Sequence, residues 1–251
     1  MTRPGTTRKR AVQPPSRTVL ITGAAKGLGR AMARHLAGPE THLLLHYHQS
    51  RAAGKELVQE LEGQGAQVTL LQADLTDPAA RERMMKQVAR KTRALQVMIN
   101  NVGLYDGRSL MEFEPEDWHK TLESGPGAVF HLIKRAVPLL TMAAPARVIN
   151  LGDSGCDRLS ARPQATPYHV AKNGVYTLTR SFARELAPLG ITVNMLSPGF
   201  FENSVGEPGT PIPAGRKGTP MDLLPALDYL LSSEAQYMTG CNLVLNGGWN
   251  L

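Results

Sequence analysis

Short apolar runs alternate along this chain with longer segments in which apolar residues recur every three or four positions. A short apolar run between polar residues is typical of a buried strand, and the longer period is typical of a helix packed on one face. The predicted strands are Thr18–Ile21, His42–Tyr47, Gln67–Leu71, Val97–Asn100, Arg147–Leu151, Ile191–Leu196 and Leu243–Leu245. The predicted helices are Leu28–Leu36, Gly54–Leu61, Asp77–Leu95, Trp118–Leu140 and Pro167–Leu186. This alternation predicts an α/β fold in a single domain, a doubly wound parallel sheet with helices on both faces.

Two segments interrupt the pattern. Residues 200–220 are rich in glycine and proline and follow a predicted strand end, which is the ligand-binding edge of a doubly wound sheet. Because long loops are uncommon unless they are functional or mobile, we expect a loop that covers the substrate, with a disordered excursion as the alternative. Gly125-Pro126-Gly127 lies inside the fourth predicted helix, and we expect it to kink that helix.

Positive charge is concentrated at the start of the chain. The 251 residues carry a net charge of +7, and residues 1–17 contain five Lys or Arg and no acid, so removing these five charges leaves +2. We expect residues 1–17 to be a basic, disordered tail and residues 18–251 to be the folded domain. Binding of nucleic acid or anionic lipid by the tail is the less favoured interpretation.

Hydropathy and cysteine content exclude several classes of protein. No apolar run approaches the roughly 20 residues of a membrane span. Cys156 and Cys241 are too few for a disulfide framework, and neither they nor His35, His119 and His169 have metal-site spacing, so we expect no metal. These features favour a cytoplasmic protein in a reducing compartment, without a membrane partner.

A glycine-rich turn lies between the first predicted strand and the first helix. Its glycines, Gly23, Gly27 and Gly29, permit a tight turn and let backbone N–H groups approach a pyrophosphate. Lys26 and Leu28 lie in the same turn, and the helix N-terminus that follows favours an anion. A turn of this kind after a strand predicts a Rossmann-like, dinucleotide-binding domain.

The end of the second predicted strand indicates which dinucleotide is bound. An NAD site normally places an acid there, and that carboxylate would repel the 2′-phosphate of NADP. No aspartate occurs between Gly23 and Asp74, whereas Lys26 and Arg51 supply positive charge, so NADP(H) is the expected cofactor. The further residues expected around it are Tyr47, His48, Gln49, Ser50, Arg51, Asp74, Leu75, Asn101, Val102 and Gly103. Asp74 is expected at the adenine, with a helix N-cap as a compatible second role.

Tyr168 and Lys172 form the candidate catalytic pair. They lie four residues apart in a predicted helix, so both side chains can project from one face. A neighbouring ammonium favours the phenolate and lowers the tyrosine pKa from its usual value of about 10. A phenol whose pKa is closer to the working pH is a usable general acid or base. Such pairs are common on exposed helices, so the pair by itself is weak evidence of catalysis. The glycine-rich turn upstream is the feature that favours a catalytic role here.

Together these residues resemble the short-chain dehydrogenases/reductases over about residues 18–250. The matching motifs are Thr22-Gly23-x-x-x-Gly27-x-Gly29, Asp74-Leu75, Asn100-Asn101-Val102-Gly103, Tyr168-x-x-x-Lys172, Val193-Asn194, Ser197-Pro198-Gly199 and Tyr237-Met238-Thr239-Gly240. The resemblance implies an NAD(P)-dependent oxidoreductase that forms a homodimer or homotetramer. It also implies that Tyr168 transfers the proton and that Lys172 binds the nicotinamide ribose. Pro198 and Gly199 would border the nicotinamide.

Within the family, three features resemble the pteridine reductases. His46–Ser50 is similar to the phosphate-binding strand end of that branch, and Asp153 stands where it carries a catalytic aspartate. Tyr105 falls where that branch has an aromatic ring that stacks on the pterin. Gly27 departs from the branch, which has an arginine at this place.

The chain departs from the wider family at two places. The usual serine lies 13 residues before the tyrosine, where this chain has Gly155. Ser154 and Asp153, 14 and 15 residues before Tyr168, are therefore the candidates that polarise the substrate. Ser154 is preferred for a carbonyl and Asp153 for a pterin. The family often has an asparagine that holds a proton-relay water, and Gly125 at that place implies an altered or absent relay.

The expected activity is hydride transfer from NADPH to a carbonyl or imine of a small substrate, such as a 3-oxoacyl-type ketone. Tyr168 would donate the proton, while Tyr105 and Phe200 would contact the substrate. A pteridine or dihydrofolate reductase is the first alternative. The second is an NADP-binding sensor or scaffold with little catalysis, suggested by Gly125 and the basic tail.

Overall fold

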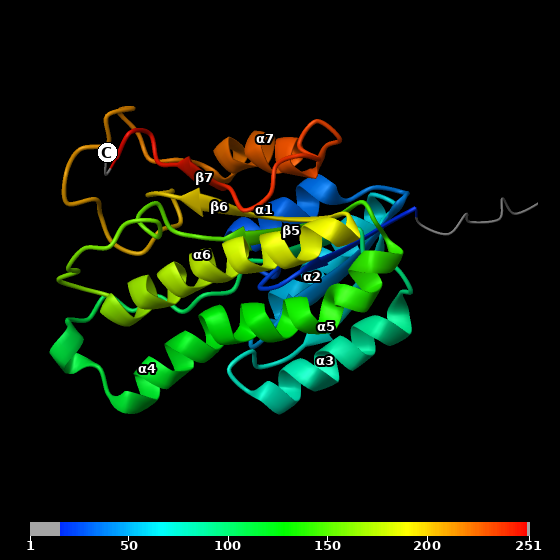
Figure 1. Ribbon diagram of the computed structural model, residues 1–251, viewed down its shortest axis with the longest axis horizontal. Coiled ribbons are helices and arrows are strands. Elements are labelled where there is room, and N and C mark those ends of the chain that lie inside the picture. Colours follow the sequence, from blue (N-terminus) through cyan, green and yellow to red (C-terminus); the bar gives the residue numbers. More distant parts are fainter. Residues whose placement is uncertain (1–15, 250–251) are drawn as a thin grey trace, which may run out of the picture.

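Seven parallel strands form one sheet in the computed structural model, which describes residues 16–249 (Figure 1). The strands are β1 Arg17–Ile21, β2 Thr41–Tyr47, β3 Gln67–Gln72, β4 Val97–Asn100, β5 Ala146–Leu151, β6 Ile191–Pro198 and β7 Asn242–Leu245. Their order is β3-β2-β1-β4-β5-β6-β7. The chain direction along the sheet reverses between β1 and β4, and ligands bind at such a switch point, outside the carboxyl ends of the strands. The predicted doubly wound sheet is confirmed.

Side chains alternate between two cores along each strand. Leu20, Leu44 and Met98 sit opposite one another in the register of β1, β2 and β4, and all three face the same core. Their neighbours Val19 and Ile21 face the other core. Because a parallel sheet is covered on both faces, its strands read as continuous apolar runs, and each fully buried aliphatic side chain contributes about 1.5–3 kcal/mol.

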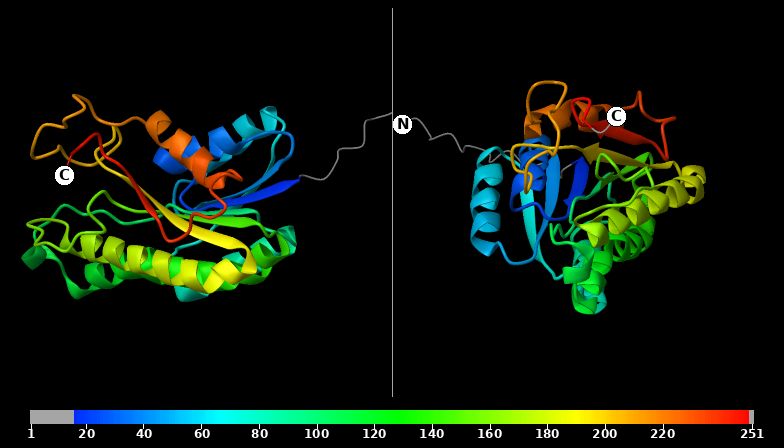
Figure 2. Two further views of the ribbon diagram at one scale, coloured as in Figure 1. Left: turned by 45° about the horizontal axis from the view of Figure 1, so that its top comes forward. Right: turned by 90° about the vertical axis from the view of Figure 1, so that its left-hand side faces the viewer.

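Helices cover the two faces in two layers, which are seen edge-on in Figure 2. One layer contains α1 Gly27–Leu36, α2 Arg51–Gly63 and α7 Pro220–Leu231. The other contains α3 Pro78–Lys91, α5 Ala128–Met142 and α6 Thr166–Leu186, with α4 Pro115–Leu122 leading into α5. Two single 3₁₀ turns span Leu110–Glu112 and Ala187–Leu189. No helix in the described part of the chain is long and apolar enough to cross a membrane.

The fourth predicted helix is kinked, as expected from its Gly-Pro-Gly sequence. A π-helical turn, Glu123–Gly127, separates α4 from α5, and Gly125 has non-helical angles of φ −91° and ψ −106°. A Cβ at Gly125 would lie 3.1 Å from the Cβ of Ala171 in α6. The glycine therefore allows the backbone of the kink to approach α6 closely.

Several predicted boundaries differ from the structure. The third predicted helix, Asp77–Leu95, ends at Lys91, because Thr92 is extended and its hydroxyl donates to the Ala94 carbonyl. Arg17 belongs to β1 rather than to the tail, and its N–H donates to the Glu40 carbonyl at 3.1 Å. The rest of the predicted tail, apart from Ser16, lies outside the described residues.

Helix α7 was missed by the sequence analysis, although a start signal precedes it. Pro220 occupies its first turn, a position that needs no backbone donor. The Asp222 carboxylate accepts hydrogen bonds from the backbone N–H of Thr219 at 2.7 Å and from its hydroxyl at 2.9 Å. This capping box turns the chain from the 200–220 loop into the helix.

Replacing Thr219 with alanine should lower the free energy of unfolding by about 1 kcal/mol, because the start of α7 loses a capping residue. Urea unfolding of the purified protein measures this change. The matched control is Thr177→Ala, at an exposed mid-helix position whose hydroxyl donates only to the Asn173 carbonyl. An effect at Thr219 no larger than that of the control would contradict the capping role.

Candidate active site

A cavity of about 660 Å³ lies at the carboxyl edge of the sheet and brings together residues from the turn after β1 to Trp249, which follows β7. The predicted site residues that line it are Lys26, Gly27, Leu28, Asn101, Gly103, Tyr105, Asp153, Ser154, Tyr168, Lys172, Pro198, Gly199 and Phe200. The catalytic, ribose and nicotinamide candidates of the sequence therefore share one cavity.

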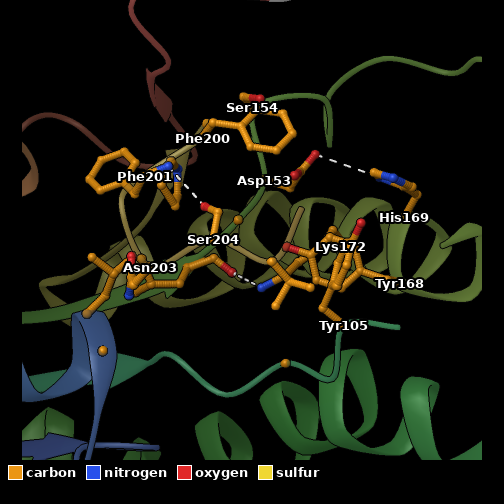
Figure 3. A pocket seen from close by; sticks show the side chains of 18 of the residues that line it. Tyr105, Asp153, Ser154, Tyr168, His169, Lys172, Phe200, Phe201, Asn203 and Ser204 are labelled. Atoms are coloured by element: carbon orange, nitrogen blue, oxygen red, sulfur yellow. Dashed lines mark hydrogen bonds and ion pairs between the residues drawn. The ribbon is translucent and has the colours of Figure 1, made fainter. Parts of the chain in front are cut away.

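Tyr168 and Lys172 project from one face of α6 into this cavity (Figure 3). The Lys172 Nζ atom lies 5.6 Å from the centre of the Tyr168 ring. Lys172 is only 7% exposed, and its ammonium donates to the Leu151 carbonyl at the end of β5 at 2.6 Å. Burial lowers the pKa of Lys172 to about 8, against an opposing effect of the nearby Asp153 charge.

The Tyr168 phenol does not show the lowered pKa that its lysine neighbour suggested. Burial raises the pKa of Tyr168 well above its usual value, and the negative charge of Asp153 raises it further. Both effects disfavour the phenolate. Tyr168 is therefore protonated at neutral pH, which is the state that a proton donor in a reduction requires.

Asp153 lies beside the catalytic pair, near the start of the loop that follows β5. Its Oδ1 atom accepts a hydrogen bond from the Gly155 N–H at 2.9 Å and lies 3.8 Å from Nδ1 of His169 (Figure 3). Burial lowers the pKa of His169, and the Asp153 carboxylate opposes that shift. Asp153 thus places a negative charge at the reacting end of the cavity.

Ser154 lines the same cavity but differs from Asp153 in its environment. Its backbone N–H donates to the Pro198 carbonyl at 3.2 Å, which ties the loop after β5 to the end of β6. Its hydroxyl is buried and has no hydrogen-bond partner among the described residues. A buried hydroxyl without a partner is unfavourable, so this oxygen is available to a ligand.

Aromatic side chains form two walls of the cavity. The Tyr105 ring meets the Tyr168 ring edge-on, with centroids 5.1 Å apart. Phe200 and Trp249 meet in the same edge-on manner at 4.7 Å. Trp249, which follows β7, therefore lines the cavity of its own chain.

The glycine turn is tightly constrained where it meets α1. A Cβ at Gly29 would collide with the carbonyl oxygen of Gly23 and lie 2.8 Å from Nδ2 of Asn101. That Asn101 nitrogen donates to the carbonyls of Thr22, at 3.0 Å, and Gly23, at 3.2 Å. The N-cap residue Lys26 makes no side-chain hydrogen bond to the first turn of α1. The N-terminal N–H groups of α1 thus remain available for an anion.

The end of β2 holds the residues predicted to recognise the 2′-phosphate. Ser50 and Arg51 stand at the N-terminus of α2, where the helix field favours negative charge. His48 is exposed, and its Nε2 atom lies 3.6 Å from a carboxylate oxygen of Asp74. Asp74 itself accepts from the backbone and hydroxyl of Thr76, so it organises a turn. The N-cap of α3 is Asp77 instead.

Several predicted cofactor residues lie outside the cavity. They are Gly23, Gly29, Tyr47, His48, Gln49, Ser50, Arg51, Asp74, Leu75 and Val102. Most of them follow the carboxyl ends of β1, β2 and β3, next to the cavity. The Leu75 side chain is buried in the core, Val102 packs against it, and the Tyr47 hydroxyl donates to Gln72. The buried side chain of Leu75 leaves only its backbone for binding, whereas Val102 is partly exposed.

The structure adds cavity residues that the sequence analysis did not select. Arg162, Pro163 and Gln164 come from the segment between Asp157 and Pro167, and His169 follows Tyr168 directly. Asn203, Ser204 and Val205 come from the 200–220 loop. The expectation that this loop covers the substrate is consistent with their place in the cavity. No sequence motif marks Arg162, because its loop is irregular.

No group of three or more His, Cys, Asp or Glu residues that could hold a metal ion occurs within residues 16–249.

Comparison with known proteins gives consistent matches over nearly the whole folded chain. The profile of the family described as enoyl-(acyl carrier protein) reductase matches residues 23–250. The 3-oxoacyl-(acyl-carrier-protein) reductase FabG of Staphylococcus aureus is 31% identical over 93% of this chain and 98% of its own length. The enzyme of the same name from Escherichia coli K12 is 31% identical over 91% of this chain and 95% of its own length.

Solved structures agree with these sequence matches. A blue fluorescent protein from a metagenomic library, in complex with NADPH, has a TM-score of 0.87 and 26% identity, covering 94% of this chain and 99% of that one. The Pseudomonas aeruginosa RhlG/NADP active-site complex has a TM-score of 0.84 and 27% identity, covering 96% of this chain and 98% of that one. With its sheet order, glycine turn and Tyr168–Lys172 pair, the chain belongs to the short-chain dehydrogenase/reductase family.

Proposed function

We propose that the protein is an NADP(H)-dependent reductase that transfers hydride to the carbonyl or imine of a small substrate, such as a 3-oxoacyl-type ketone. The observation that carries this proposal is the shared cavity, in which Tyr168 and Lys172 face the turn after β1 and the Pro198-Gly199 pair. The FabG relatives and the structures bound to NADP or NADPH support it.

The residues present fit a dinucleotide. A side chain at Gly29 would collide with the Gly23 carbonyl, so the turn is built for close backbone approach. The uncapped start of α1 offers N–H groups to a pyrophosphate. Ser50, Arg51 and the N-terminus of α2 form a positive, hydrogen-bonding end that suits a 2′-phosphate. Lys26 adds a second positive charge at the cavity.

The reaction then follows from the positions of the side chains. NADPH, when bound, supplies the hydride. Tyr168, which is protonated at neutral pH, donates its phenolic proton to the atom that becomes negative. Lys172 holds the ribose end of the cavity and supplies the nearby positive charge that stabilises a phenolate. Ser154 or Asp153 orients the acceptor group from the loop after β5.

A pteridine or dihydrofolate reductase is the second candidate, and two observations favour it. Asp153 places a carboxylate at the reacting end, where a substrate amine or amidine would hydrogen-bond to it. Tyr105 presents an aromatic ring at the same end.

A sensor or scaffold without catalysis has less support, because the intact Tyr168–Lys172 pair faces the cavity. We also propose a homodimer or homotetramer, as the family resemblance implies, located in the cytoplasm, as the low cysteine content favours.

Replacing Tyr168 with phenylalanine should lower turnover at least about 100-fold, because the reaction loses its general acid, while the Kd for NADPH stays near the wild-type value. The assay follows NADPH consumption with an acetoacetyl thioester, with dihydrobiopterin and without substrate, and NADH tests the cofactor preference. Retained turnover in the variant would reject Tyr168 as the proton donor.

Two further variants separate the substrate classes. Asp153→Asn should reduce dihydrobiopterin turnover by about tenfold or more if a carboxylate must bind a substrate amine. Ser154→Ala should instead reduce thioester turnover if a hydroxyl polarises the ketone. If neither the thioester nor dihydrobiopterin supports NADPH consumption by the wild-type enzyme, both substrate classes would be excluded.

Substituting Gly29 with alanine should raise the Kd for NADPH by at least about tenfold, because the new methyl group displaces the Gly23 carbonyl. Isothermal titration calorimetry measures the affinity directly. Gly38→Ala is the matched control, since a Cβ at Gly38 meets no heavy atom within 4 Å. Equal affinities in the two variants would contradict a pyrophosphate site at this turn.

The pH profile should report the buried Lys172. Its pKa of about 8 means that the ammonium is charged below that pH and loses its proton above it. We therefore expect kcat/KM to fall by about tenfold per pH unit above pH 8, since this ratio reports groups of the free enzyme. Lys172→Arg keeps the charge and should move the alkaline limb upward. A profile that stays flat to pH 10 would show that the charge is not required.

A further inference from the structure

His46 is a buried histidine that has no role in the proposed reaction. It is the penultimate residue of β2 and is only 1% exposed. Its Nδ1 atom accepts a hydrogen bond from the Gly23 N–H at 3.1 Å. Its Nε2 atom lies 3.0 Å from the carbonyl oxygen of Ala73, directly after β3. One imidazole therefore joins the carboxyl ends of three neighbouring strands.

These partners determine the tautomer of the ring. A backbone N–H can only donate, so Nδ1 must be the unprotonated nitrogen, and a carbonyl can only accept, so Nε2 must carry the hydrogen. Burial lowers the pKa of His46 to about 4, which keeps the ring neutral at physiological pH. A protonated ring would have no acceptor for the Gly23 N–H.

The backbone of His46 takes part in the same arrangement. Its carbonyl accepts the N–H of Ala24 at 2.9 Å, so one residue binds two successive N–H groups of the turn. Gly23 has a φ of +64°, and its carbonyl accepts from Nδ2 of Asn101 on the opposite side. The peptide groups on both sides of Gly23 are therefore held by side chains of β2 and of the residue after β4.

We infer that His46 is a positioning residue of the cofactor site, which holds the Gly23 N–H inward so that the following N–H groups, at the start of α1, face the pyrophosphate. The inference rests on the proposed dinucleotide site and concerns a residue that does not touch the ligand. Losing the imidazole releases Gly23 and lets the turn adopt other conformations. Binding of NADPH then includes the entropic cost of ordering the turn again.

The chain supplies a matched control in His42, on the same strand and at its opposite end. His42 is 3% exposed, and its Nε2 atom lies 2.9 Å from the Thr69 hydroxyl. It is thus a second buried, hydrogen-bonded histidine that is remote from the glycine turn. Leucine has about the volume of an imidazole ring and lacks its nitrogens. A change in packing alone should therefore affect the His46→Leu and His42→Leu variants alike.

The experiment compares NADPH affinity, thermal stability and kinetics in the full chain. His46→Leu should raise the Kd and the KM for NADPH by about tenfold or more, with kcat at saturating NADPH within about threefold of wild type. His46→Gln should restore affinity to within about threefold, because its amide presents an acceptor and a donor as the two ring nitrogens do. His42→Leu should lower the Tm and leave the Kd for NADPH within about twofold of wild type.

Two results would overturn the positioning role. One is a His46→Leu variant that binds NADPH within twofold of wild type, and the other is a His42→Leu variant with an equal loss of affinity. If His46→Leu does not fold, His46→Asn, whose shorter side chain cannot reach both partners, decides the question by the same criteria. A wild-type chain that binds no NADPH would instead reject the proposed function, so the two failures are distinguishable.

Discussion

The hydrogen bond from the Lys172 ammonium to the Leu151 carbonyl fastens α6 to the end of β5, and the rest of the site is arranged around it. A buried ammonium is unfavourable unless it has polar partners, and at the carboxyl end of a parallel strand a carbonyl is left free to accept. The same bond sets the position of Tyr168, one helical turn earlier, in the cavity. Burial also lowers the pKa of Lys172 to about 8 and raises that of Tyr168, so at neutral pH the amine carries its charge beside a protonated phenol.

The second constraint is the shape of the glycine turn. Gly23 has a left-handed conformation, and His46 and Asn101 bind its peptide groups from two other strands. The turn is therefore a product of the sheet as a whole, although its glycines are local. These hydrogen bonds hold the turn without using the first N–H groups of α1. Those N–H groups stay available to an anion, as an anion-binding helix N-terminus requires.

The sequence predicted the main elements because each has a strong local signal. All seven strands follow from short apolar runs, and Gly125-Pro126-Gly127 marks the kink before α5. Helix α7 was missed because its apolar residues follow a long glycine- and proline-rich loop, where periodicity gives little guidance. The candidate site was predicted where residues form motifs, as in Tyr168 and Lys172. It was not predicted where irregular loops contribute, as with Arg162 and Asn203.

By itself, the sequence determined the parallel α/β architecture, the dinucleotide turn and the pairing of Tyr168 with Lys172, since periodicity and short spacings depend only on neighbouring residues. The tertiary structure decided the direction of the Tyr168 pKa shift and the tautomer of His46. It also decided that Trp249 lines the active-site cavity of the same chain. Burial, tautomer and charge proximity depend on residues that are distant in sequence, and only the packed sheet brings them within a few ångströms of one another.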